Sequence, residues 1–446
     1  MSTRRVVVTG LGPVTPLGTG VTAFWNSLLE GRSAIRRIRA FDPGRFKTQI
    51  GGEIDDLKIS DAVPKGYRKA AKIMARDIVL AVVAAHEAVK DADLKTKCRI
   101  EREEVSGPAN MDSARFGANI GSGLICADLP ELTEALYSAT RDGQFTLERW
   151  GGEGMNNLTP LWLLKFLPNM LACHVTIVHD AQGPSNTITC GEASSHLAIG
   201  EAFRTITRGD ADVCICGGAE SKTNPMALVR QGLGGRLSQD NEHPERACRP
   251  FAVDRSGAVV SEGGGLVILE ELEHARARGA RIYAEVVGFG AGHDAHIAQP
   301  GHPHPEGRGA AVAMRKALRD AGLTPGDVDL VASFACGLVE HDRSEAAAYR
   351  SVLGPRIADV PVMNIKAGLG NNGAGSGAID FIAAVLAVHY ATVPPAFNST
   401  PVDPACGLRM VVDGPRDVKV QHALSLAYAL GGGQYAGLVI RRYRDE

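Results

Sequence analysis

Short apolar runs that end at or near glycine recur along the first half of the chain. They occupy residues 5–10, 116–121, 187–190, 211–217 and 265–272. Apolar runs of this length, bounded by turn residues, are typical of strands that are covered on both faces of a sheet. The pattern therefore predicts a sheet with helices packed on both sides.

Helical periodicity separates these runs. Leu197, Phe203 and Ile206 share one face of a helix predicted over residues 195–207, and residues 309–321 form a second amphipathic pattern. The alternation of strand and helix patterns predicts an α/β fold.

The second half of the chain repeats this alternation. Strands are predicted at residues 329–335, 360–365, 410–412 and 424–429. A nearly all-apolar helix over residues 377–389 must be buried on every side. Because no long linker intervenes, we expect two similar halves, residues 1–270 and 271–446, in one compact domain. Residues 95–112 are the least regular and are predicted to be a solvated loop without chemistry.

Composition and charge narrow the range of partners. The 446 residues are 44% apolar, and 48 basic residues nearly balance 50 acidic ones. Without a dense basic patch, neither nucleic acid nor an anionic membrane surface is an expected partner. No apolar run approaches the ~20 residues of a membrane span, and the first ten residues lack a signal-peptide pattern. We expect a cytoplasmic protein that binds a small molecule or another protein.

The cysteine and histidine pattern gives no sign of a metal or a cofactor. The nine cysteines are scattered, and Cys214 and Cys216 are separated by one residue in an apolar run without a matching pair. Zinc sites favour paired ligands at wider spacing on fixed elements. His293, His296, His302 and His304 cluster in a stretch rich in proline and glycine, which is typical of a surface loop. We therefore expect no metal and no cofactor.

Three long motifs give the chain a family resemblance. They are RRVVVTGLGPVTPLG at 4–18, GPSNTITCGEASSHLAIGEA at 183–202, and CRPFAVDRSGAVVSEGGGLVILEELEHARARGARIYAEVVGFG at 248–290. With them the chain resembles the elongating beta-ketoacyl-acyl carrier protein synthases of the thiolase superfamily, as a degenerate member similar to a chain-length factor. The resemblance implies duplicated βαβαβαββ halves in a five-layer αβαβα arrangement, and an obligate dimer.

The resemblance also implies three catalytic positions, which in the family hold one cysteine and two histidines. The cysteine takes the acyl chain at a strand-to-helix elbow, and the histidines assist decarboxylation and polarise the thioester. Counted along the motifs, the cysteine position holds Glu192, and the histidine positions hold Phe334 and Asn371. A phenyl ring cannot donate a proton, and an amide cannot titrate.

Other family positions are retained or lost. Lys366, Asp342 and Glu345 keep their spacing, whereas Cys336 and Leu338 stand where two threonines would hold the pantetheine arm. The combined replacements predict that acyl transfer through this site has been abandoned. Chain-length factors carry glutamine at the elbow, and Glu192 departs from that pattern.

Two residues near the elbow offer alternative chemistry. Cys190 is the remaining candidate nucleophile, although a free thiol has a pKa near ~8.5 without a base to lower it. Glu192 is a candidate general base, or else a carboxylate that caps the following helix and fills the old oxyanion region. His196, four residues later, would share a helix face with Glu192.

Three functions remain open from the sequence. The first is a non-catalytic subunit that pairs with an active ketosynthase in fatty-acid or polyketide synthesis. The second is an enzyme with repurposed chemistry at Glu192 or Cys190, and the third is a homodimer that binds an acyl chain or an acyl carrier protein.

In the family, segments that cross the dimer axis close the partner's acyl tunnel. The matching stretches here, residues 124–136 and 161–168, are predicted to form tunnel or interface surface. In the first stretch Leu129, Leu132 and Leu136 recur at helical spacing. The candidate residues are Leu124, Leu129, Leu132, Trp162, Leu163 and Leu164.

Overall fold

The computed structural model describes residues 4–294, 301–431 and 433–444. Among these residues the main sheet has 14 strands and crosses the molecule, and five strands from each half of the chain make up most of it. In the first half these strands are, in spatial order, β1 (Val6–Thr15), β10 (Val260–Glu271), β9 (Val213–Ser221), β5 (Phe116–Ser122) and β8 (Ser185–Ile188). In the second half they are β11 (Ala284–His293), β18 (Gln434–Arg441), β17 (His422–Tyr428), β12 (Leu330–Ala332) and β13 (Pro361–Met363).

The two halves have the same strand pairing. In the order given, the first two pairs are antiparallel and the next two are parallel in each half. Strands β1 and β11 pair with each other and join the halves. This repeated pattern confirms the predicted duplication of an α/β unit.

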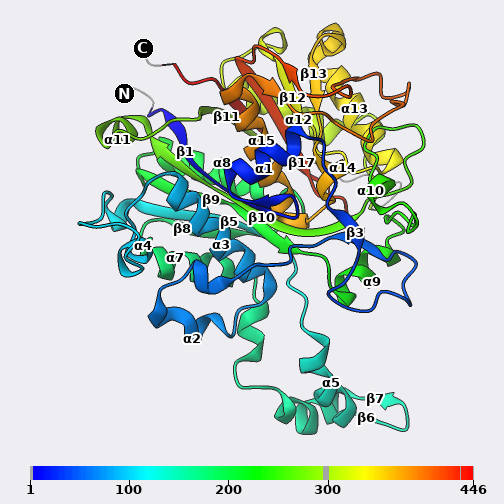
Figure 1. The fold of residues 1–446 in the computed structure, drawn as a ribbon. Helices are drawn as coiled ribbons and strands as arrows, with labels where there is room; N and C mark the ends of the chain where they lie inside the picture. Colours follow the sequence, from blue (N-terminus) through cyan, green and yellow to red (C-terminus); the bar gives the residue numbers. More distant parts are fainter. Residues whose placement is uncertain (1–3, 295–300, 432, 445–446) are drawn as a thin grey trace.

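The helices complete a five-layer arrangement (Figure 1). Helices α8 (Ser194–Thr207) and α15 (Ser376–Tyr390) contact each other between the halves of the sheet. The outer layers are α3 (Arg76–Asp91) with α7 (Met170–His179), and α12 (Arg308–Asp320) with α13 (Val339–Leu353). Because α15 is enclosed by both halves, its residues are nearly all apolar and buried, as the sequence predicts.

The segment Gly373–Tyr390 qualifies by length and composition as a membrane span, contrary to the expectation that no apolar stretch is long enough. Inside the protein, 89% of this segment is buried. Enclosure between the two halves of the main sheet explains its composition without a membrane.

Shorter elements connect these layers. The remaining helices are α1 (Val21–Leu29), α2 (Arg68–Ala71), α4 (Lys97–Glu101), α5 (Leu129–Ser138), α6 (Leu147–Arg149), α9 (Pro225–Leu233), α10 (Pro244–Ala247), α11 (Leu272–Ala277) and α14 (Lys366–Leu369). The remaining strands are β2 (Gly18–Thr19), β3 (Ile35–Arg37), β4 (Ile50–Gly52), β6 (Thr140–Arg141), β7 (Gln144–Phe145), β14 (Thr392–Val393), β15 (Arg409–Met410) and β16 (Arg416–Asp417).

Two sequence predictions are wrong in detail. The strand expected at residues 187–190 is β8, which begins two residues earlier and is partly exposed, because it lies at the edge of the sheet and not inside it. The solvated loop expected at 95–112 contains α4, in which Cys98 and Arg99 are buried. Apolar contacts with α3 and α7 stabilise a helix in this segment, and the polar composition of the segment gave no indication of it.

One segment projects away from the layers. Figure 1 shows the teal-coloured arm with α5, β6 and β7 extending from the body, and we define the arm as residues 124–168. Its contacts run mainly between its own elements. Several large apolar side chains of the arm are exposed, among them Tyr137, Leu147 and Leu161, each at more than 75%.

Candidate functional site

A tight elbow joins the edge strand β8 to the central helix α8. Gly191 has a φ of 55°, in the left-handed region that favours glycine, and an added Cβ would lie 3.2 Å from the Cβ of Ala429. The turn places Glu192 just before the helix, with its side chain almost fully buried.

Three groups contact the Glu192 carboxylate. The ammonium of Lys222 lies 2.7 Å from Oε1, and the amide of Asn371 donates to the same oxygen at 3.3 Å. The backbone N–H of Leu430 donates to Oε2 at 3.1 Å. The structure thus brings Glu192 and Asn371 into contact, as their shared family site implies.

The charge state of Glu192 follows from these contacts. Burial by itself raises the pKa of this carboxyl, but the charge and hydrogen bond of Lys222, with the N–H of Leu430, lower the pKa to about 2. Burial lowers the pKa of Lys222, and the negative charges of Glu192 and Glu220 outweigh that effect and raise it. The pair is therefore ionised at neutral pH.

Glu220 completes a buried ionic cluster, which we define as Glu192, Lys222 and Glu220. The backbone N–H of Ala374 donates to Glu220 Oε2 at 2.7 Å. Burial raises the pKa of Glu220 in spite of the nearby Lys222 charge. A Cβ at Gly373 would lie only 1.9 Å from Glu220, so glycine is needed there for the cluster to fit.

Phe334 lies in a second buried group. Its ring contacts the Tyr428 ring at a centroid distance of 4.8 Å, and the Lys366 ammonium lies 4.7 Å from its centroid. Glu345 accepts the backbone N–H groups of Phe334 and Ala335, each at 2.8 Å. Glu345 therefore fixes the backbone of this loop, which gives a structural reason for its retention.

Lys366 and Asp342 also have structural partners. Lys366 forms a buried ion pair with Asp380. Asp342 accepts the N–H of Phe251 at 2.9 Å and lies 3.4 Å from the Arg255 guanidinium. Burial raises the pKa of Asp342 to about 7, although both partners oppose that shift.

Within the described part of the chain, Cys190 and His196 have no partner that would activate them for catalysis. Burial raises the pKa of the Cys190 thiol, and Cys190 Sγ has no hydrogen-bond partner among the described residues. His196 does not pair with Glu192. Its Nε2 lies 2.9 Å from the hydroxyl of Ser425, on the other half of the sheet, and burial lowers the pKa of His196 to about 3.

A cavity of about 430 Å³ opens above the ionic cluster. Glu192, Glu220 and Lys222 form part of its wall, with Leu124 from the arm and Leu430 from the C-terminal loop. Arg230 and Arg236 also line this cavity, so an anionic group inside it would meet positive charge.

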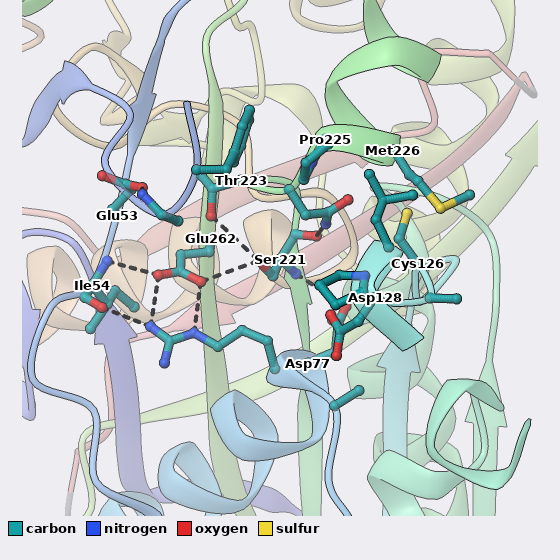
Figure 2. Close-up of a pocket in the computed structure, with 18 of the residues that line it drawn as sticks. Glu53, Ile54, Asp77, Cys126, Asp128, Ser221, Thr223, Pro225, Met226 and Glu262 are labelled. Carbon is teal, nitrogen blue, oxygen red and sulfur yellow. Dashed lines mark hydrogen bonds and ion pairs between the residues drawn. The ribbon is translucent and has the colours of Figure 1, made fainter. Parts of the chain in front are cut away.

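A larger cavity of about 770 Å³ lies between the body and the base of the arm (Figure 2). Figure 2 shows Glu262, a buried residue of the wall, in the middle of a hydrogen-bond network, where it accepts hydrogen bonds from the Ile54 N–H and the Ser221 hydroxyl. Glu262 also accepts two hydrogen bonds from one edge of the Arg76 guanidinium, from Nε at 2.9 Å and from Nη2 at 2.8 Å. Cys126 and Leu129 belong to the wall on the arm side.

The proposed tunnel residues take three kinds of position. Leu124 and Leu129 line cavities and are 57% and 42% exposed. Leu132 and Trp162 are half-buried, and the Trp162 ring contacts Phe166 at 5.6 Å. Leu163 and Leu164 are exposed.

Sequence reasoning missed Lys222, Glu220 and the Leu430 N–H as partners of Glu192. Their signal is weak: in GGAESK two charged residues stand at alternate positions at the end of an apolar strand. Side chains at alternate strand positions point to the same face, so Glu220 and Lys222 were recognisable as a pair near one point.

The duplicated halves, the central helices and the elbow at the sheet edge define a protein class. The family model described as "Beta-ketoacyl synthase, N-terminal domain" matches residues 3–275, and the family model described as "Beta-ketoacyl synthase, C-terminal domain" matches residues 283–400. The chain belongs to the beta-ketoacyl synthase family and has its thiolase-type fold. This is a family of transferases in fatty-acid and polyketide biosynthesis.

Similar proteins align over nearly the whole chain. The 3-oxoacyl-acyl-carrier-protein synthase 2 of Synechocystis sp. is 36% identical, with 99% of each chain covered. A chain of the ishigamide ketosynthase/chain length factor superimposes with a TM-score of 0.83 at 28% identity, covering 99% of this chain and 100% of the other. The same values hold for a chain of AntDE:AntF, a type II PKS acyl-carrier protein in complex with its ketosynthase bound to the hexaketide.

Proposed function

We propose that this chain is a ketosynthase-like subunit that does not itself condense acyl groups and that acts by pairing with an active ketosynthase. The ion pair between Glu192 and Lys222 at the elbow carries the proposal. The family's nucleophile position holds an ionised carboxylate whose lone pairs are already used by Lys222, Asn371 and Leu430. Such a carboxylate cannot form the thioester intermediate on which condensation depends.

The contacts of Glu192 also argue against repurposed base chemistry. A general base works best when its pKa lies near the working pH. The pKa of Glu192 is lowered to about 2, because Lys222 and Leu430 overcome the effect of burial. The described residues also include no basic partner for the Cys190 thiol, so we propose a structural role for this site.

Two surfaces of the protein favour binding of a partner chain. The edge strand β8 leaves its outer backbone groups unpaired within the described sheet, and such edges are normally paired or covered. The arm, residues 124–168, exposes large apolar side chains, which mark an interaction surface when they gather in one region. We propose that both surfaces contact one partner subunit, either an active ketosynthase or a second copy.

The likeness to the ishigamide ketosynthase/chain length factor supports a ketosynthase as the partner. The likeness to AntDE:AntF, which contains an acyl-carrier protein, supports an acyl carrier protein as a further partner. In this proposal the arm also limits product length sterically, with Leu132 and Trp162 as the residues that fill space next to the partner's acyl chain.

The test is reconstitution with a candidate ketosynthase, ideally one encoded beside this chain. Native mass spectrometry should detect a one-to-one heterodimer, and the heterodimer should elongate acyl carrier protein thioesters while this chain alone does not. A homodimer that does not bind the ketosynthase would overturn the proposal and favour a homodimeric protein that binds an acyl chain or an acyl carrier protein.

Chain-length control is tested in the same heterodimer. Leu132→Ala and Trp162→Ala should lengthen the products, because a filled apolar wall tolerates misfit only at a cost of ~1–3 kcal/mol. Val312→Ala, on the outer helix α12, is the matched control. Unchanged product lengths in heterodimers that still turn over would leave this chain a scaffold only.

A further inference from the structure

A buried cluster of metal-binding side chains lies outside the candidate site. It consists of His86 on α3, Cys98 on α4 and His179 at the end of α7. One ligand atom of each residue lies within 4.8 Å of the other two, and all three side chains are buried. We define these three residues as the His-Cys-His cluster.

The outer nitrogen of each histidine has a partner that fixes its orientation. His86 Nε2 lies 3.2 Å from a carboxylate oxygen of Glu104. His179 Nδ1 lies 2.9 Å from the hydroxyl of Thr96. When those nitrogens carry the protons, the lone pairs of His86 Nδ1 and His179 Nε2 are free, which is the arrangement that orients metal-bound histidines.

The inner atoms are poorly satisfied by protein contacts. His86 Nδ1 lies 3.9 Å from Cys98 Sγ. His179 Nε2 is fully buried and has no hydrogen-bond partner among the described residues. A buried polar atom without a partner is costly, and few such atoms occur in native structures. The remaining contact of the Cys98 thiol is a weak one, to the Ala62 carbonyl at 3.4 Å.

We propose that the His-Cys-His cluster binds one thiophilic transition-metal ion, with Zn²⁺ as the expected ion. Two imidazoles and one thiolate are ligands that zinc prefers, and three protein ligands leave one tetrahedral position for water. On binding, a sulfur–metal bond replaces the Cys98 S–H bond, and the thiol proton leaves to solvent. No electron transfer is involved.

The surroundings set two properties of the site. Burial raises the pKa of Cys98 to about 12, so the ion must displace a proton, and affinity rises with pH. Arg99 and Arg102 both form ion pairs with Glu104, and their positive charges disfavour a nearby metal cation. The affinity for the ion must therefore come from its bonds to the three ligands.

The ion would connect three elements of the outer layer. It would tie α4 to α3 and to the end of α7, from which the chain leads into the edge strand β8. The expected effect is stabilisation of the folded chain, because an ion that binds only the folded state raises the free energy of unfolding by RT ln(1 + L/Kd), where L is the free ion concentration. This role is independent of the proposed function.

The test uses tag-free full-length protein, stripped with a chelator and dialysed against Zn²⁺ or Co²⁺. Elemental analysis should find one zinc per chain, and the melting temperature should rise with Zn²⁺ concentration. Bound Co²⁺ should show a thiolate-to-cobalt charge-transfer band and tetrahedral d–d bands. Cys98→Ser should abolish the charge-transfer band and weaken Zn²⁺ binding at least ~10-fold, and Glu104→Gln should weaken it by ~10-fold or more.

Cys173→Ser, on α7 but outside the cluster, is the matched control and should leave zinc content and the cobalt spectrum unchanged. If Cys98→Ser fails to fold, His179→Gln replaces it. Wild type that binds no zinc above the level of His179→Gln, or a cobalt complex without a thiolate band, would overturn the proposal.

Discussion

The ion pair between Lys222 and Glu192 is predicted to be a large local contribution to stability. The pKa of Glu192 falls from 4.5 to about 2, chiefly because Lys222 outweighs the effect of burial. A shift of that size corresponds to about 3 kcal/mol in favour of the ionised form. Lys222→Met leaves this carboxylate buried without its cation, and breaking a buried pair in this way typically costs ~3–5 kcal/mol.

A double-mutant cycle separates the pair from its surroundings. Glu192→Gln removes the charge and keeps an oxygen for the Leu430 N–H, so it should cost less than Lys222→Met. The double variant should be more stable than the sum of the single losses by ~1–3 kcal/mol, since residues in one network couple. Urea unfolding at matched protein concentration measures each free energy, and Lys69→Met, at an exposed lysine, is the control.

The pH dependence gives an independent check. A carboxyl whose folded pKa is lowered contributes stability that is present above its unfolded pKa and is lost as the pH falls. The difference between wild type and Lys222→Met should therefore narrow as the pH falls from 4.5 toward 2. A Lys222→Met variant within ~0.5 kcal/mol of wild type at pH 7 would refute the account of this cluster, because surface substitutions alone have effects of that size.

Three further predictions concern chemistry, titration and assembly. Glu192→Cys alone should not restore condensation in a carrier-protein assay, because Phe334 and Asn371 cannot supply the acid-base steps, each worth ~10²–10⁴ in rate; measurable elongation would disprove this. Burial and the charge of Glu220 raise the pKa of Asp77 to about 8, so the free energy of unfolding of wild type should fall as the pH rises from about 4 to 8. Urea denaturation of Asp77→Asn should show a weaker dependence of this free energy on pH, and an equal dependence in both proteins would contradict the prediction. The interface at β8 and the arm should bury more than ~2,000 Å² in a structure of the complex, as obligate dimers do, and a monomer in solution would exclude it.

The sequence predicted the layered fold because strand and helix patterns are local. The helix predicted over residues 195–207 formed within one residue of its expected bounds, whereas the strand predicted at 211–217 begins two residues later and ends four residues later, as β9. The nearly all-apolar helix predicted at 377–389 is buried as expected. The edge position of β8 was not predictable, because a short apolar run has the same pattern at an edge and inside a sheet.

The site was only partly predictable for the same physical reason. The family motifs located Glu192 and Asn371, which the structure brings together across 179 residues of sequence. Lys222 and Leu430 became partners of Glu192 through packing between separate elements, which periodicity does not encode. The His-Cys-His cluster was missed because its members come from three segments, one of which was predicted to be a loop.

The central claim is that this chain cannot carry an acyl group at the elbow. The most direct measurement is the intact mass of the wild-type protein after incubation with an acyl-loaded acyl carrier protein, with an active ketosynthase as the positive control. The account predicts an unmodified mass for this chain and an acyl adduct on the control. An acyl adduct on wild type that disappears in Cys190→Ser would contradict the account and make Cys190 the nucleophile of an active enzyme.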